Sequence, residues 1–268
     1  MGGTMSLKGK SALVTGSLGG IGFATASALA ALGCDIMLNG FADEAVIRQR
    51  QDELARTHGV HAAYHGADLA DPPQIAELVN ATVATHGSLD ILVNNAVVRY
   101  FAPVEKFDPA DWDRAIAVNL SAPFHLIRLG LPHMRRAGWG RIVNMASVMG
   151  FFGTVDRVDY VTTKTGIVGL TRAVALEVAR SAITCNAICP GAVLSPATEG
   201  RLEAAAAREG RDKAELLREY FETNTRQPSG RFIEADNVAG LIAFLCGPHG
   251  ADINGAALPI DGAWLAGR

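Results

Sequence analysis

Three side chains with the chemistry of an acid–base centre follow one another along the chain: Ser147, Tyr160 and Lys164. The tyrosine and the lysine are four residues apart in a segment of helical character, so they share one face of a helix. A free phenol ionises near pH ~10 and is a poor base at neutral pH. A neighbouring ammonium lowers this pKa, and the serine hydroxyl could hold the oxygen that gains or loses the proton. The spacing alone also fits a solvated helix face, so the remaining sequence has to distinguish the two.

The composition is that of a globular protein with a substantial core, since 49% of the 268 residues are hydrophobic and 19% are charged. The net charge of -3 argues against a surface for nucleic acid or for an anionic membrane. No apolar run is long enough to span a bilayer, and the first residues lack the apolar core of a signal peptide. The four cysteines have no metal-ligand spacing and fit buried free thiols. We therefore expect a cytoplasmic protein without a bound metal.

Apolar segments of strand length alternate with helical patterns from end to end of the chain. Strands that are buried on both faces and separated by helices predict a parallel sheet with right-handed crossovers. Because no linker or repeat divides the chain, we expect residues 1–268 to form one α/β domain with a Rossmann-type, doubly wound sheet, and residues 1–6 to be disordered. The predicted strands cover 11–15, 35–39, 61–66, 89–94, 141–145, 183–189 and 256–260. The predicted helices cover 21–32, 43–58, 73–86, 112–136 (as one helix or two), 160–180 and 238–246.

Residues 195–227 interrupt this alternation and are rich in Ala, Glu and Arg. Insertions at the carboxyl edge of such sheets often cover the ligand crevice, so this segment is predicted to be a helical lid over the substrate. An additional pair of surface helices fits the same composition.

A glycine-rich turn joins the first predicted strand to the first predicted helix. Gly16, Gly20 and Gly22 have the spacing G-x-x-x-G-x-G, which lets the backbone approach a pyrophosphate at the helix N-terminus. The second strand ends at Asn39, whose uncharged amide can hydrogen-bond a ribose hydroxyl. No Arg or Lys stands in the turn or directly after Asn39 to pair with a 2′-phosphate. The sequence therefore predicts a dinucleotide site that favours NAD over NADP.

Taken together, these residues resemble the short-chain dehydrogenase/reductase family over nearly the whole chain. The motifs that carry the resemblance are the T-G-x-x-x-G-x-G turn, Asp68, Asn94-Asn95-Ala96, Asn119, Ser147, Tyr160-x-x-x-Lys164 and Pro190-Gly191. The resemblance implies a seven-stranded sheet, a homotetramer, and reversible hydride transfer between an alcohol and NAD. One departure is Val97, where the family usually has glycine.

The resemblance also assigns roles to individual residues. It implies a catalytic tetrad in which Tyr160 exchanges the proton, Lys164 lowers its pKa, Ser147 holds the substrate oxygen and Asn119 holds a water in a relay to Lys164. Asp68 should contact the adenine. The implied cofactor-binding residues are Gly16, Leu18, Gly20, Ile21, Gly22, Asn39, Phe41, Asp68, Leu69, Asn95, Ala96, Tyr160, Lys164, Pro190, Gly191, Val193 and Ser195.

Within the family, the segments around 38–41, 90–96 and 186–191 look like bacterial D-3-hydroxybutyrate dehydrogenases. The pocket positions differ, because Arg99, Met149 and Arg157 stand where those enzymes bind a carboxylate with Gln, His and Lys. Arg201 and Ala192 replace a Gln and a Trp, and Trp264 is kept. Arg157 and Arg201 also look like the sulfonate-binding pair of R-2-hydroxypropyl-coenzyme M dehydrogenase.

Arginine's planar fork suits a bidentate oxyanion, so the sequence predicts a small anionic hydroxy or keto substrate. A 3-hydroxybutyrate-like acid is the leading candidate, and a hydroxy-sulfonate or a larger polar acid remains open. The arginines could instead be solvated or paired with Asp156, Asp159 or Glu199. A dinucleotide-binding regulator without activity is the remote alternative, which the intact tetrad disfavours. The predicted substrate-binding residues are Arg99, Ser147, Met149, Arg157, Tyr160, Ala192, Arg201 and Trp264.

Overall fold

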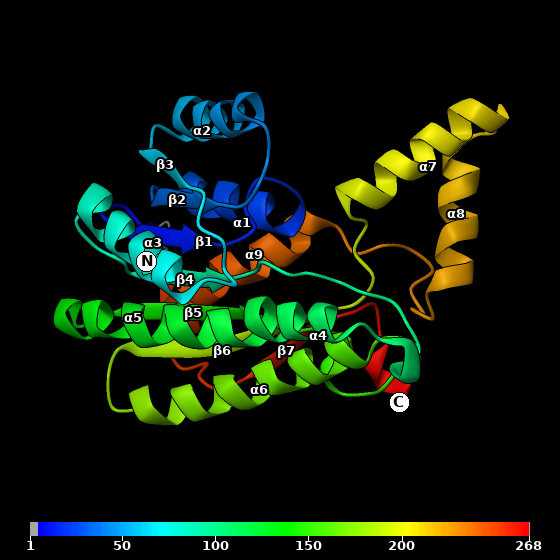
Figure 1. Ribbon diagram of the computed structural model, residues 1–268. Coiled ribbons are helices and arrows are strands. Elements are labelled where there is room, and N and C mark those ends of the chain that lie inside the picture. The colour runs from blue at the N-terminus through cyan, green and yellow to red at the C-terminus, as the bar shows by residue number, and fades with distance from the viewer. Residues whose placement is uncertain (1–4, 268) are drawn as a thin grey trace.

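A seven-stranded parallel sheet organises the protein (Figure 1). The computed structural model describes residues 5–267, apart from the side chains of residues 197 and 224. The strand order is β3-β2-β1-β4-β5-β6-β7, so the direction of winding reverses between β1 and β4 and leaves a crevice at the carboxyl ends of the strands. The predicted Rossmann-type sheet is confirmed. The strands are β1 (Ser11–Val14), β2 (Asp35–Asn39), β3 (Ala62–His65), β4 (Ile91–Asn94), β5 (Gly140–Met145), β6 (Ile183–Pro190) and β7 (Ala257–Ile260).

Helices cover both faces of the sheet, which explains why every residue of the central strands β1, β4 and β5 is buried. The long helices are α1 (Gly20–Ala31), α2 (Glu44–His58), α3 (Pro72–His86), α5 (Ala122–Ala137), α6 (Val158–Val178) and α9 (Ala235–Cys246). In β1 the side chains alternate between two cores, with Val14 in the core under α1, α2 and α9 and Leu13 in the core under α3, α5 and α6. Short 3-10 turns lie at Val104–Lys106, Val148–Gly150, Pro248–Gly250 and Leu265–Gly267.

The segment predicted as one or two helices over 112–136 contains an irregular turn. Helix α4 (Pro109–Ile116) runs into a π-helical turn, Ala117–Ser121, before α5 begins. Such single π turns are rare and occur frequently at functional sites. This turn carries Asn119.

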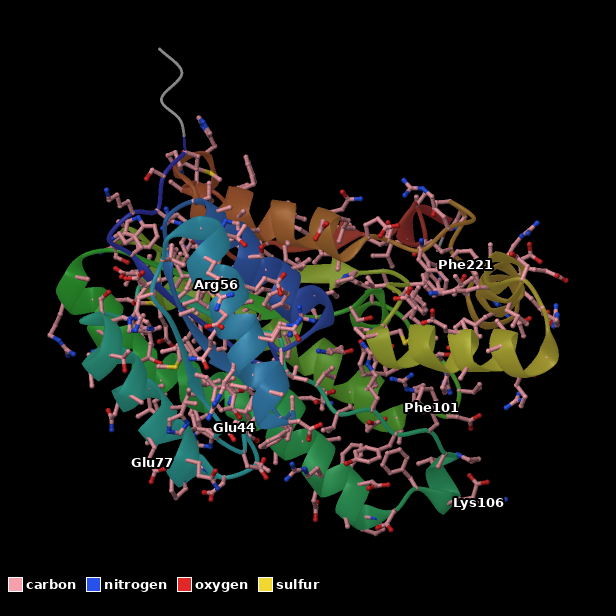
Figure 2. The ribbon with its side chains drawn as sticks, turned by 90° about the horizontal axis from the view of Figure 1, so that it is seen from above. Glu44, Arg56, Glu77, Phe101, Lys106 and Phe221 are labelled. Atoms are coloured by element: carbon pink, nitrogen blue, oxygen red, sulfur yellow. The ribbon has the colours of Figure 1, made fainter. Side chains whose placement is uncertain are left out.

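The insertion between β6 and α9 forms two helices, α7 (Pro196–Glu209) and α8 (Lys213–Asn224). They project from the body beyond the carboxyl edge of the sheet (Figure 1). From above, the pair and the labelled Phe221 lie at one end of the molecule, and α2 with Glu44 and Arg56 lies toward the other (Figure 2). A bridge between Val193 and Ile233 joins the two ends of the insertion at its base.

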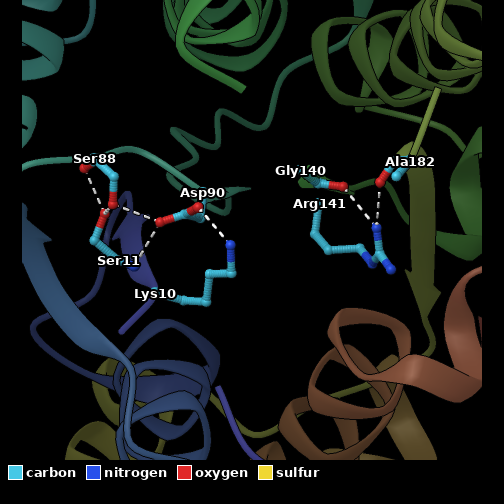
Figure 3. A network of polar contacts seen from close by, with 7 residues as sticks. All are labelled: Lys10, Ser11, Ser88, Asp90, Gly140, Arg141 and Ala182. Atoms are coloured by element: carbon cyan, nitrogen blue, oxygen red, sulfur yellow. Dashed lines mark hydrogen bonds and ion pairs between the residues drawn. The ribbon is translucent and has the colours of Figure 1, made fainter. Parts of the chain in front are cut away.

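Polar contacts link the amino ends of the strands, opposite the crevice (Figure 3). The Asp90 carboxylate accepts hydrogen bonds from the Ser11 backbone N–H at 3.0 Å and from the Lys10 ammonium at 3.1 Å. At the start of β5 the Arg141 guanidinium donates to the carbonyl oxygens of Gly140 and Ala182, each at 2.9 Å. These contacts fix the amino ends of the strands and leave the carboxyl ends to form a site.

Among residues 5–267, no helix has the length and apolarity needed to cross a bilayer. The same residues contain no cluster of three or more His, Cys, Asp or Glu side chains arranged to hold a metal ion. The expected disorder of residues 1–6 falls largely on residues 1–4, which lie outside the described range, while the Ser6 hydroxyl accepts a bond from the Lys8 N–H at 3.3 Å.

Candidate active site

A cavity of about 220 Å³ lies at the carboxyl ends of β4, β5 and β6. Ser147, Tyr160 and Lys164 line it together. Ser147 follows β5 and starts a 3-10 turn, and its hydroxyl accepts a hydrogen bond from the Met149 N–H at 3.2 Å. Tyr160 and Lys164 occupy the first two turns of α6 on one face, as their spacing predicted. The three side chains therefore meet at one end of the crevice.

The lysine is held firmly beside the tyrosine. Lys164 is only 3% exposed, and its Nζ donates to the Met145 carbonyl oxygen at 2.6 Å. The same nitrogen lies 5.5 Å from the centre of the Tyr160 ring. Burial lowers the pKa of Lys164, and the neighbouring Tyr160 opposes this effect. Cys189 is also close to this ammonium, but burial raises the pKa of its thiol to about 12, so it stays neutral.

The phenol of Tyr160 is 8% exposed and lies among positive charges. Burial alone would raise the pKa of Tyr160, but Lys164 and Arg99, a hydrogen bond with Ser147, and Arg157 together bring it below its usual value. The arrangement therefore favours a phenolate that can accept a proton nearer to neutral pH.

Asn119 lies near this centre but outside the lining of the cavity. Its side chain is buried and is bonded to the backbone of Val98, which follows β4. A relay water could therefore be bound only by the main chain of Asn119. The proton relay to Lys164 stays a prediction. Val97, the departure from the family pattern, does line the cavity.

The glycine turn has the shape that a pyrophosphate requires. Gly16 and Gly20 have positive φ angles of 61° and 53°, which side-chain-bearing residues rarely adopt. A Cβ at Gly22 would lie 2.1 Å from the Gly16 carbonyl oxygen. Asn95 braces the same turn, because its Nδ2 donates to the carbonyl oxygens of Thr15 and Gly16 at 2.9 and 3.0 Å. Since Gly19 has no side chain to cap α1, the N-terminal N–H groups of this helix remain free for phosphate oxygens.

The adenosine end of the crevice differs in detail from the prediction. Asn39 is only 1% exposed, and its Nδ2 donates to the carbonyl oxygens of His65 and Ala67 at 3.0 and 3.1 Å. Only its Oδ1 is left to accept a bond from a ribose hydroxyl. Asp68 is paired with Arg114 at 2.9 and 3.1 Å, a partner that sequence reasoning missed. These hydrogen bonds lower the pKa of Asp68.

The remaining predicted cofactor residues fall into two groups. Ile21, Pro190, Gly191, Val193 and Ser195 line the cavity with the catalytic side chains. Leu18, Phe41, Leu69 and Ala96 lie outside its lining, toward the glycine turn and the carboxyl ends of β2 and β3. A Cβ at Gly40 would lie 3.4 Å from the Leu18 side chain, and Phe41 is 69% exposed.

Two of the three predicted arginines reach the cavity. Arg99 and Arg157 line it, and their guanidinium carbons lie 5.6 and 4.4 Å from the centre of the Tyr160 ring. Arg201 is exposed on α7 and is not among the lining residues. Met149, Ala192 and Trp264 line the cavity as predicted.

The alternative that these arginines form ion pairs is not supported by the contacts. Within the described part of the chain, Arg99, Arg157 and Arg201 make no ion pair within 4.0 Å. Glu199 is instead paired with Lys213 at 3.1 Å. Burial lowers the pKa of Arg157, and the neighbouring Arg99 adds to this effect. Two guanidinium groups therefore approach the same space without a carboxylate between them.

Sequence reasoning missed several lining residues that come from the insertion and the segment after it. They are Thr198, Tyr220, Thr225 and Phe232. The Ser195-x-x-Thr198 spacing carried a weak signal, because Ser195 caps α7 and accepts a bond from the Thr198 N–H at 3.2 Å. Nothing local marked Tyr220 or Phe232, whose rings stack 6.5 Å apart.

A doubly wound sheet with a glycine turn at its first crossover and a Ser–Tyr–Lys cavity at its carboxyl edge defines an oxidoreductase of the nicotinamide-dinucleotide class. Comparison with known proteins identifies the family. The family model described as short chain dehydrogenase matches residues 10–206. The chain therefore belongs to the short-chain dehydrogenase/reductase family, whose members bind nicotinamide dinucleotides.

Individual relatives cover almost the whole chain. The D-beta-hydroxybutyrate dehydrogenase of Cupriavidus necator is 42% identical over 261 residues, which are 97% of this chain and 99% of that protein. The crystal structure of levodione reductase matches with a TM-score of 0.86 and 32% identity, over 97% of this chain and 99% of that one. The L-sorbose reductase of Gluconobacter frateurii, solved with NADPH and L-sorbose, matches with a TM-score of 0.89 and 27% identity, over 96% and 97%.

Proposed function

We propose that this protein is an NAD-dependent dehydrogenase that interconverts a small anionic secondary alcohol, a 3-hydroxybutyrate-like acid, and its ketone. The observation that carries the proposal is the charge of the cavity. Arg99, Arg157 and Lys164 line it, and no Asp or Glu of the described residues does. Like charges held close together in a partly buried space repel, and an anionic ligand relieves that repulsion. A negatively charged substrate fits this cavity better than a neutral one.

The chain's own groups would act as follows in alcohol oxidation. Ser147 donates a hydrogen bond to the substrate oxygen, and the Tyr160 phenolate accepts the hydroxyl proton. Lys164 favours that phenolate and would hydrogen-bond the nicotinamide ribose, and the Asn119 main chain would hold a relay water beside it. When bound, the nicotinamide dinucleotide supplies the acceptor for the hydride of the carbinol carbon.

The choice of a hydroxy carboxylate is supported by the name of the 42%-identical relative, a D-beta-hydroxybutyrate dehydrogenase. Met149 and Ala192 stand where the resemblance to D-3-hydroxybutyrate dehydrogenases implies a His and a Trp. The smaller Ala192 leaves room in the pocket for a larger acid. The second candidate is a hydroxy-sulfonate. It is favoured by the presence of two guanidinium forks, which suit an oxyanion with three oxygens.

The choice of NAD rests on the absence of Arg and Lys from the glycine turn and from the residues directly after β2. Arg50 of α2 does reach this region, where its Nε donates to the Leu18 carbonyl oxygen at 3.3 Å. Its charge is already engaged by Glu53 at 2.8 Å and lies over the Phe23 ring. A cation that is paired in this way is a weak partner for a 2′-phosphate.

We further propose that residues 1–268 act as one domain in the cytoplasm and that residues 195–227 close over the substrate. Thr198, Tyr220 and Thr225 at the base of the insertion already line the cavity. A homotetramer is proposed from the family, and exposed apolar side chains on α5 and α6, such as Phe124 and Leu176, support it.

Initial rates of NAD reduction test the proposed function directly. The panel is D-3-hydroxybutyrate, its neutral methyl ester, 2-hydroxypropanesulfonate and 2-butanol. We expect kcat/KM for one of the two anions to exceed that for the neutral compounds at least ~tenfold, as a charged hydrogen bond provides. Arg99→Ala and Arg157→Ala should each raise the KM of that anion ~10–100-fold. The control Arg180→Ala, at an exposed arginine outside the cavity lining, should leave it unchanged. Preference for the neutral compounds, or tight NADH binding without turnover of any alcohol, would contradict the proposal.

A further inference from the structure

Arg157 is held by aromatic rings rather than by acceptors. Its guanidinium carbon lies 4.1 Å from the centre of the Phe101 ring and 4.4 Å from the centre of the Tyr160 ring. Its buried Nε has no hydrogen-bond partner among the described residues. The two ring faces are therefore the main contacts that set the position of this charge.

The two rings differ in their surroundings. Tyr160 is buried within α6, but Phe101 lies in the segment between β4 and α4 and is 71% exposed. It lies at the end of the molecule from which α7 and α8 project (Figure 2). A large exposed aromatic ring contributes little to the core, so its contact with Arg157 is the feature that needs explaining.

We infer that Phe101 is a positioning residue: its ring holds the Arg157 guanidinium over Tyr160, so that one cation serves both the substrate anion and the proton-transferring phenol. The inference rests on the proposed function, since it assumes an anionic substrate in this cavity. It adds a residue that is not part of the cavity lining and reaches the site through Arg157.

The inference has an electrostatic consequence for Tyr160. The charged groups that act on this phenol are Lys164 on α6, Arg99 after β4, and Arg157 itself, and the Ser147 hydroxyl adds a hydrogen bond. Arg157 in turn is affected by Arg99 and by the buried Asp159. A guanidinium released by loss of the Phe101 ring would become more solvated and would act less on Tyr160. The pKa of the phenol would then rise, and alcohol oxidation would need a higher pH.

The test compares Phe101→Leu with Phe101→Tyr, which restores a ring, and with Phe151→Leu, a control at another exposed phenylalanine. Rates are measured from pH 6 to 10 with D-3-hydroxybutyrate and with its methyl ester, at saturating NAD. Phe101→Leu should raise the KM of the acid about three- to fivefold, the size of one exposed cation–π contact, and should leave the KM of the ester unchanged. It should also move the acid limb of kcat/KM to higher pH. Phe101→Tyr and Phe151→Leu should behave like the wild type.

Unchanged KM and pH profile in Phe101→Leu would overturn the inference, and so would an equal rise in KM for the acid and the ester. These results differ from failure of the proposed function, in which the wild type itself would not distinguish the acid from the ester. In that event the pH profile of Phe101→Leu alone decides whether the ring acts on Tyr160 through Arg157. Because Phe101 is exposed, melting temperatures should match among the variants.

Discussion

Both polar atoms of the Asn119 side chain are bonded to one residue, Val98. Its Oδ1 accepts from the Val98 N–H at 2.9 Å, and its Nδ2 donates to the Val98 carbonyl oxygen at 3.0 Å. Asn119 lies in the π turn between α4 and α5, whereas Val98 follows β4 and directly precedes Arg99. The pair therefore attaches the arginine-bearing segment to the helical layer beside α6.

Replacing Asn119 by alanine should loosen that segment. Loss of both bonds leaves the Val98 backbone groups without partners, so the free energy of unfolding should fall by about 1–3 kcal/mol. The KM of an anionic substrate should rise because Arg99 is no longer fixed. Denaturant titration and initial rates measure the two effects, with the exposed Asn237→Ala on α9 as the control. A large loss of kcat at unchanged stability would show instead that the Asn119 amide acts directly in catalysis.

The sequence predicts those parts of the site that depend on local spacing and on the alternation of strands with helices. Local spacing alone predicts that Tyr160 and Lys164 lie side by side, because residues at i and i+4 share one face of a helix whatever the remaining fold is. The alternation of buried strands with helices likewise predicted the sheet, and the position of the glycine turn followed from it.

Side-chain direction was harder to predict, because it depends on partners distant in the chain. Asn39 turns its amide toward the carbonyl oxygens of His65 and Ala67 at the end of β3, and Asp68 pairs with Arg114 of α4. Residue type groups Arg201 with Arg99 and Arg157, yet it lies exposed on a helix pair that projects from the body (Figure 1). None of these outcomes follows from propensity or from residue type.

The charge of Lys164 should set the pH dependence of the reaction. Burial raises the pKa of Tyr160 and the surrounding cations lower it, so Lys164→Met removes a lowering effect and the pKa rises. In the proposed reaction alcohol oxidation requires the phenolate, so its rate should increase as pH rises through this pKa. The acid limb of kcat/KM should move to higher pH, and kcat at pH 7 should fall by about 10²–10⁴-fold. If the acid limb of Lys164→Met stays at the pH of the wild type, the limb reports the ionisation of a group other than Tyr160. Tyr160→Phe is the control and should lose the limb altogether.

The close approach within the glycine turn predicts a severe effect of one methyl group. In Gly22→Ala the new Cβ would lie 2.1 Å from the Gly16 carbonyl oxygen and 2.6 Å from Asn95 Nδ2, so the turn has to move. We expect NADH binding to weaken at least ~tenfold and stability to fall by about 1–3 kcal/mol, as for an overpacked core. Gly19→Ala is the matched control, because its Cβ would be 3.9 Å from the nearest atom, the Pro196 Cγ. Fluorescence titration with NADH and thermal melting distinguish the two variants, and equal binding would contradict the prediction.

Coenzyme preference should respond to Phe41 rather than to Gly40. Gly40 has a φ angle of 151° and its Cβ would lie 3.4 Å from Leu18, so an arginine there would be strained. Phe41 is 69% exposed and can accept a long side chain without disturbing the core. Phe41→Arg should therefore raise kcat/KM for NADP about tenfold, because a guanidinium can pair with the 2′-phosphate, and should leave the melting temperature unchanged. Phe41→Leu is the control, because it removes the aromatic ring without adding a charge and should therefore not improve the use of NADP. Equal use of NAD and NADP by the wild type would contradict the proposed preference for NAD, whatever the variants do.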